Sequence, residues 1–221
     1  MCELLGISSQ HPQAWHEVLG RFRGRGGDTA DNPDGWGIAW RAGGTWQLHK
    51  APEPAWQSPR FAAIAQQVTS DLLIAHVRKA NPPSPFTLQN THPFLRECCG
   101  RQWVFAHNGK VPEVVQPEGC CHPKLAVPEG QTDSEHAFYF LLEEIVEAFE
   151  HSAGSLSWAA RLAELSGDIA CYGQFNFLMS NGEYLLAYGH DRLHRLQTRH
   201  ADHHVMLIAS APLDIRKLNW P

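Results

Sequence analysis

Apolar residues recur along this chain at two spacings, and each spacing predicts a different kind of element. Trp15, Val18, Leu19 and Phe22 are three or four positions apart, which places them on one face of a helix. A longer stripe with the same spacing follows Asp133, where we expect a second helix to begin; its members are Phe138, Leu141, Leu142, Ile145, Val146 and Phe149. Two further helices are predicted, over residues 58–67 and 156–165.

Short apolar runs between turn residues predict the strands. The turns Ala42-Gly43-Gly44 and Asn181-Gly182 each indicate a hairpin. Strands joined by hairpins, with the helices in separate blocks, are typical of an α+β fold with antiparallel sheets. No repeat or linker divides the chain, so we expect a single domain over residues 1–221. The predicted strands cover residues 2–7, 37–40, 45–49, 72–77, 103–106, 175–179, 184–188, 193–197 and 205–209.

Composition narrows the classes of partner. The net charge of −5 argues against nucleic acid or an anionic membrane. No apolar run is long enough to cross a bilayer and no signal peptide is apparent, so we expect a cytoplasmic protein with no membrane partner. The cysteine pairs Cys98-Cys99 and Cys120-Cys121 are adjacent, whereas zinc-binding cysteines are normally spaced. No metal site is therefore predicted.

Polar residues collect at the ends of three predicted strands, where a sheet holds side chains rigidly. Arg78 ends one apolar run, Asn108-Gly109 ends another, and Cys2 begins the first strand. If Met1 is removed, Cys2 carries a thiol and a free α-amino group on one residue. With reference pKa values of ~8.5 and ~7.7–8.0, the amine can accept the thiol proton at neutral pH. Packing of Cys2 in a buried strand is the simpler alternative.

Each of the other polar residues also has two interpretations. Asn108-Gly109 by itself predicts a hairpin turn, but an amide and a following N–H also suit an oxyanion hole. Arg78 suits either a buried ion pair or a clamp for a substrate carboxylate. Asp133 suits either a helix N-terminus, with Thr132 and Glu135 as a capping box, or a substrate ammonium. His76, His92 and His107 suit either the core or the surroundings of a site.

Six stretches, in this order along the chain, resemble the class II glutamine amidotransferases, a family of N-terminal nucleophile (Ntn) hydrolases. The stretch at the start and the lack of an attached synthetase or transferase domain resemble the stand-alone, YafJ-like branch. The stretches are "MCELLGIS", "NPDGWGIAW", "IAHVRKA", "NTHPF", "FAHNGK" and "GQTDSEHAF".

The resemblance implies a fold and a set of roles. The fold is a four-layer αββα sandwich of two antiparallel sheets. Cys2 would be the nucleophile, with its own amine as base. The remaining roles are assigned to other stretches of the chain: Asn108 and Gly109 to the oxyanion hole, Arg78 to the substrate α-carboxylate, Asp133 to the α-amino group, and His92 and Trp36 to the substrate pocket.

The function implied is hydrolysis of the side-chain amide of glutamine through a γ-glutamyl thioester, which releases ammonia and glutamate. Neither a metal nor an organic cofactor is needed, and a separate enzyme would accept the ammonia. Two alternatives remain open. One is a hydrolase of another γ-glutamyl small molecule, which would use the same residues. The other is a catalytically silent binding or regulatory module with the same fold.

Overall fold

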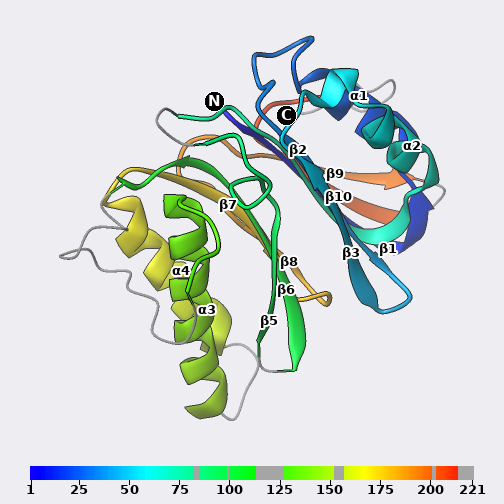
Figure 1. The fold of residues 1–221 in the computed structure, drawn as a ribbon. Helices are drawn as coiled ribbons and strands as arrows, with labels where there is room; N and C mark the ends of the chain where they lie inside the picture. The colour runs from blue at the N-terminus through cyan, green and yellow to red at the C-terminus, as the bar shows by residue number, and fades with distance from the viewer. Residues whose placement is uncertain (82–84, 99, 113–126, 152–156, 201–202, 214–221) are drawn as a thin grey trace.

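Two antiparallel sheets form the centre of the computed structural model, which describes residues 1–81, 85–98, 100–112, 127–151, 157–200 and 203–213 (Figure 1). The six-stranded sheet has the order β3-β2-β4-β1-β10-β9. Its strands are β1 (Glu3–Ala14), β2 (Trp36–Ala42), β3 (Thr45–Ala51), β4 (Thr69–Val77), β9 (His194–His200) and β10 (His203–Ala209).

The four-stranded sheet has the order β5-β6-β7-β8 and packs face to face against the first. Val104, Ala106 and Leu178 from this sheet meet Leu4 and Ile74 from the other in an apolar layer between the two. Alternate residues of each strand point to opposite faces of its sheet. Because one face packs on the other sheet and the opposite face packs on helices, both faces of each sheet carry apolar residues. The strands of this sheet are β5 (Phe94–Cys98), β6 (Arg101–Lys110), β7 (Gln174–Ser180) and β8 (Leu185–Tyr188).

Helices cover the two outer faces, which completes an α/β/β/α arrangement of four layers (Figure 1). The six-stranded sheet is covered by α1 (His16–Gly24) and α2 (Pro59–Gln67), and a short 3-10 helix spans Ala55–Gln57. The four-stranded sheet is covered by α3 (Asp133–His151) and α4 (Ser157–Ala170). The α+β sandwich expected from the sequence is therefore confirmed.

The helices begin where the sequence signals placed them. Thr132 Oγ1 accepts a hydrogen bond from the Glu135 backbone N–H at 3.2 Å, which is one half of the predicted capping box. The Glu135 carboxylate bonds instead to Arg96 and to the Glu129 and Gly130 N–H groups. Ser58 caps α2 as Thr132 caps α3, accepting from the Phe61 N–H at 3.2 Å. Among the described residues, no helix is long and apolar enough to span a bilayer.

The turn prediction for Asn108-Gly109 is wrong. Both residues lie inside β6, which continues to Lys110 and pairs with β7 through the contacts Asn108↔Asn176 and Gly109↔Phe175. The hairpin at Asn181-Gly182 does join β7 to β8. Strand β5 was not predicted, because Arg96 and Glu97 interrupt its apolar pattern.

Candidate active site

Cys2 lies immediately before β1, a strand that hydrogen-bonds to β4 and β10 on its two sides. The antiparallel register pairs Glu3 with Val77, so the residues that flank this pair, Cys2 and Arg78, lie next to each other at the end of the sheet. Arg78 is only 4% exposed. The sheet therefore brings the thiol and the guanidinium together from residues far apart in the sequence.

The Cys2 thiol contacts the main chain of Lys79 twice. The Lys79 N–H donates to Sγ at 3.2 Å, and the thiol donates to the Lys79 carbonyl oxygen at 3.3 Å. Burial raises the pKa of Cys2, while the Lys79 N–H and the charges of the chain's amino terminus and Arg78 act in the opposite direction. At neutral pH this thiol is therefore protonated and needs a base before it can react.

Asn108 reaches Cys2 from the other sheet. It continues the row formed by Val104 and Ala106 on β6, whose side chains face the six-stranded sheet. Its Nδ2 donates to the carbonyl oxygen of Cys2, and an amide nitrogen has a second hydrogen to offer. The side chain is 1% exposed, so this amide is held in place beside Cys2.

Gly109 follows in a backbone conformation that other residues rarely adopt, with φ of +152°. A Cβ at this position would fall on the carbonyl oxygen of Gln174 in β7. Glycine therefore allows β6 and β7 to pair at the point where they reach the site.

Asp133 is positioned by the main chain at the start of α3. Its Oδ2 accepts from the Val111 N–H at 2.7 Å, and its Oδ1 accepts from the Ser134 N–H at 2.8 Å. A carboxylate has about four lone-pair positions, so both oxygens retain capacity for another donor. Val111 directly follows the last residue of β6, Lys110, so this bond ties the carboxylate to the end of the strand that carries Gly109.

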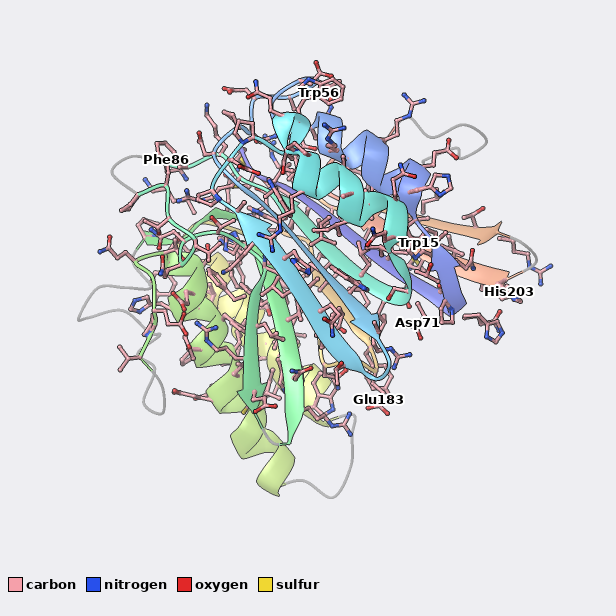
Figure 2. All side chains as sticks on the ribbon, turned by 45° about the vertical axis from the view of Figure 1, so that its right-hand side comes forward. Trp15, Trp56, Asp71, Phe86, Glu183 and His203 are labelled. Atoms are coloured by element: carbon pink, nitrogen blue, oxygen red, sulfur yellow. The ribbon has the colours of Figure 1, made fainter. Side chains whose placement is uncertain are left out.

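A pocket of about 370 Å³ opens at this end of the sandwich. The structure brings five of the seven predicted site residues to its wall: Cys2, Arg78, His92, Gly109 and Asp133. Phe86 lies beside it with its ring centroid 6.0 Å from the Arg78 guanidinium carbon, at the opposite end of the molecule from Asp71 and Glu183 (Figure 2).

Three buried histidines belong to this region: His92 and His107 line the pocket, and His76 lies behind His92. His92 Nδ1 is 3.2 Å from His76 Nε2, and burial lowers the pKa of His76 to about 3 and that of His92 well below its usual range. His107 Nε2 donates to the Gln174 carbonyl oxygen at 3.2 Å, and its Nδ1 lies 2.8 Å from Ser134 Oγ. Burial lowers the His107 pKa as well, so all three rings are neutral at pH 7.

The prediction that Trp36 belongs to the pocket is wrong. Its side chain is fully buried in the core under α2, where the ring centroid lies 5.2 Å from that of Phe61. The "GWG" stretch reaches the site through Gly37 instead. A Cβ on Gly37 would fall on the carbonyl oxygen of His92 and lie 2.7 Å from Pro93 Cδ, so this glycine lets β2 pack directly against the His92-Pro93 segment.

Sequence reasoning missed the main chain of Lys79 and the side chain of Ser134. Main-chain contacts leave no residue signature, so the Lys79 contact had no signal to find. Ser134 was detectable in principle, because it stands between Asp133 and the capping residue Glu135.

Nothing in the described part of the chain forms a cluster of histidine, cysteine or acidic residues able to hold a metal ion. Cys171, at the end of α4, is exposed, and its thiol donates to the Gly167 carbonyl oxygen at 3.4 Å. Cys99, Cys120 and Cys121 lie outside the described residues.

Comparison with known proteins gives a consistent result over nearly the whole chain. A family model described as "Glutamine amidotransferases class-II" matches residues 1–218. The Escherichia coli (strain K12) protein YafJ is 36% identical over 205 residues, which cover 90% of this chain and 77% of YafJ.

Two further relatives differ in how much they share. The gamma-glutamyl-hercynylcysteine sulfoxide hydrolase of Mycolicibacterium smegmatis is 29% identical over 157 residues, 71% of this chain and 60% of that protein. A crystal structure of a "predicted glutamine amidotransferase" from Pseudomonas aeruginosa PA01 superimposes with a TM-score of 0.67 at 28% identity. That superposition covers 100% of this chain and 93% of the other.

Proposed function

The chain belongs to the class II glutamine amidotransferases, and on that basis we propose that it hydrolyses the side-chain amide of glutamine with Cys2 as nucleophile. One observation carries the proposal. The Cys2 thiol, the Arg78 guanidinium and the Asp133 carboxylate line one pocket, with the Asn108 amide bonded to the carbonyl of Cys2. One cation and one anion suit the carboxylate and ammonium of an amino acid.

The mature enzyme begins at Cys2. Once Met1 is removed, the α-amine takes the thiol proton, and Sγ attacks the side-chain carbonyl carbon of glutamine. The negative charge on the carbonyl oxygen is stabilised by the second N–H of Asn108 and the Gly109 N–H. The C–N bond then breaks, the α-ammonium returns the proton, and ammonia leaves. Water hydrolyses the remaining γ-glutamyl thioester to glutamate and regenerates the thiol.

The test combines mass spectrometry with a glutamate-release assay. We expect the purified protein to begin at Cys2, to release glutamate from glutamine, and to lose this activity in Cys2→Ala. The electrophile 6-diazo-5-oxonorleucine should label Cys2 and no other cysteine. A mature chain that neither turns over glutamine nor reacts with this electrophile would reject the proposal.

A second candidate, hydrolysis of larger γ-glutamyl amides, is favoured by the size of the pocket. A cavity of about 150 Å³ holds benzene, and glutamine has fewer than twice as many non-hydrogen atoms. The pocket of about 370 Å³ therefore has room for a substituent on the amide nitrogen. The relative from M. smegmatis is named for a γ-glutamyl substrate of this kind.

The two candidates are separated by kcat/KM for glutamine and for a series of γ-glutamyl amino acids. Higher kcat/KM for the substituted amides supports the second candidate, and higher kcat/KM for glutamine supports the first. A chain that retains Met1 and turns over neither substrate would instead favour a catalytically silent binding module.

A further inference from the structure

Residues Arg78–Ala80 are held in place from outside the pocket by Asp34 and Gly35. The Arg78 N–H donates to the Gly35 carbonyl oxygen at 2.7 Å, and the Asp34 N–H donates to the Arg78 carbonyl oxygen at 3.0 Å. The Asp34 side chain adds a third bond, because its Oδ2 accepts from the Ala80 N–H at 2.8 Å. Asp34 is not among the residues that line the pocket.

The same three residues carry two parts of the candidate site. The Arg78 side chain lines the pocket, and the Lys79 N–H donates to Cys2 Sγ at 3.2 Å. The Lys79 peptide therefore lies between two fixed points. Arg78 is bonded to Asp34 and Gly35 before it, and Ala80 is bonded to the Asp34 carboxylate after it.

We propose that Asp34 is a positioning residue that sets the reactivity of the Cys2 thiol by holding the Lys79 N–H against Sγ. The proposal rests on the proposed function, in which Cys2 Sγ is the nucleophile. Asp34 touches neither the thiol nor the pocket, and its effect passes through the Ala80 and Lys79 peptides. This gives "NPDGWG" a second role, beside that of Gly37 under His92.

The physical reason is that a thiolate in this position depends on few groups. Burial disfavours the charged sulfur, and the hydrogen bond from the Lys79 N–H is the strongest influence in its favour. The charges of the amino terminus and Arg78, and the main-chain N–H of Cys2 itself, act in the same direction. His92, His107, Lys110 and Asp133 also line the pocket. Hydrogen bonds weaken steeply as their geometry degrades, so a small shift of the Lys79 peptide is enough to raise the thiol pKa.

Asp31 provides a matched control in the same loop. It also carries one negative charge and also contacts Lys79, but its Oδ2 bonds to the Lys79 ammonium at 2.8 Å rather than to the main chain. Its side chain is 80% exposed, so this ion pair contributes little. Asp31→Ala removes one negative charge from the same loop, and because Asp31 bonds only to the Lys79 side chain, the hydrogen bonds of the Lys79 and Ala80 main chain are retained.

The experiment measures how fast iodoacetamide alkylates Cys2 as a function of pH, with mass spectrometry of the Cys2 peptide to exclude the other thiols. The protein is the full chain with Met1 removed. In Asp34→Ala we expect the apparent thiol pKa to rise and alkylation near neutral pH to slow about tenfold, the factor carried by one hydrogen bond. Asp34→Asn keeps an acceptor oxygen and should stay near wild type, and Asp31→Ala should stay within about twofold of wild type.

Three outcomes would overturn the proposal. In the first, the apparent Cys2 pKa of Asp34→Ala equals that of wild type. In the second, Asp31→Ala raises this pKa as much as Asp34→Ala does. In the third, Asp34→Asn raises it as much as Asp34→Ala does, which would make the charge of Asp34 the cause. Should Asp34→Ala fail to fold, Ala80→Pro removes the N–H that Asp34 accepts. It should reproduce the slower alkylation while Asp34 is intact, and wild-type alkylation would overturn the proposal.

Where both variants fold, a double-mutant cycle adds a further check. If Asp34 acts through Ala80, Cys2 in the double variant Asp34→Ala/Ala80→Pro should be alkylated no more slowly than in the slower of the two single variants. Alkylation needs no glutamine, so the measurement distinguishes a failure of the positioning role from a failure of the proposed hydrolysis. A wild-type chain that releases no glutamate, with alkylation still slowed by Asp34→Ala, would leave the positioning role intact and reject the hydrolysis.

Discussion

Replacing the buried histidine His76 by asparagine should make the protein less sensitive to acid. His76 is fully buried, and its pKa is lowered from 6.5 to about 3. Between these two values the unfolded chain binds a proton that the folded chain does not, so stability falls as the pH is lowered through this window. Above pH 6.5, the pKa of histidine in the unfolded chain, the contribution of neutral His76 to stability is fully present.

The magnitude follows from the two pKa values. Lowering the pH from about 7.5 to about 5 should cost about 2 kcal/mol through His76 alone, because each pH unit below 6.5 costs about 1.4 kcal/mol. His92 and His107 add losses of the same sign. For a chain of this length, about 2 kcal/mol corresponds to a fall in Tm of about 4–8 °C.

The assay is urea unfolding of wild type and His76→Asn at both pH values. The substitution itself costs stability at either pH, so the informative quantity is the difference between the two. We expect this difference to be about 2 kcal/mol smaller in His76→Asn than in wild type. His16→Asn, at the exposed start of α1, should leave the difference unchanged. An equal difference in wild type and His76→Asn would refute the reasoning.

Three further substitutions test the site and its packing. Asn108→Ala should lower kcat by about 10²–10³, the usual effect of losing one oxyanion donor, while iodoacetamide still alkylates Cys2; wild-type kcat would contradict the oxyanion role. Gly109→Ala should lower the free energy of unfolding by about 2–4 kcal/mol, because the φ of +152° and the Gln174 carbonyl both exclude a Cβ at this position. An unchanged urea midpoint would argue against this geometry. Gly37→Ala should lower Tm and raise KM, because the new Cβ would displace His92. Gly20→Ala is the control: a Cβ there meets nothing within 4 Å, so the free energy of unfolding should rise by about 0.5–1 kcal/mol. Equal Tm values for the two variants would contradict the packing at Gly37.

The long periodic elements were predictable because their apolar spacing matches one local geometry. The apolar stripe after Asp133 predicted helix α3, Thr132 was predicted as its capping residue, and Asn181-Gly182 predicted a hairpin; the structure has all three. The failures came where a local preference was overridden by pairing. Asn108-Gly109 has the strongest turn signal among dipeptides, yet pairing with β7 keeps both residues within strand β6.

The sequence by itself determined the chemistry that is available: a cysteine directly after Met1, an arginine and an asparagine at strand ends, and an aspartate at a helix start. Tertiary structure decided which of these meet. Only the register of β1 against β4 places Cys2 beside Arg78, and only the packing of the two sheets brings the Asn108 amide to Cys2. It also moved Trp36 into the core and gave Gly37 its place under His92. The reason is that distances between residues far apart in the chain depend on sheet pairing and packing, which local sequence patterns do not encode.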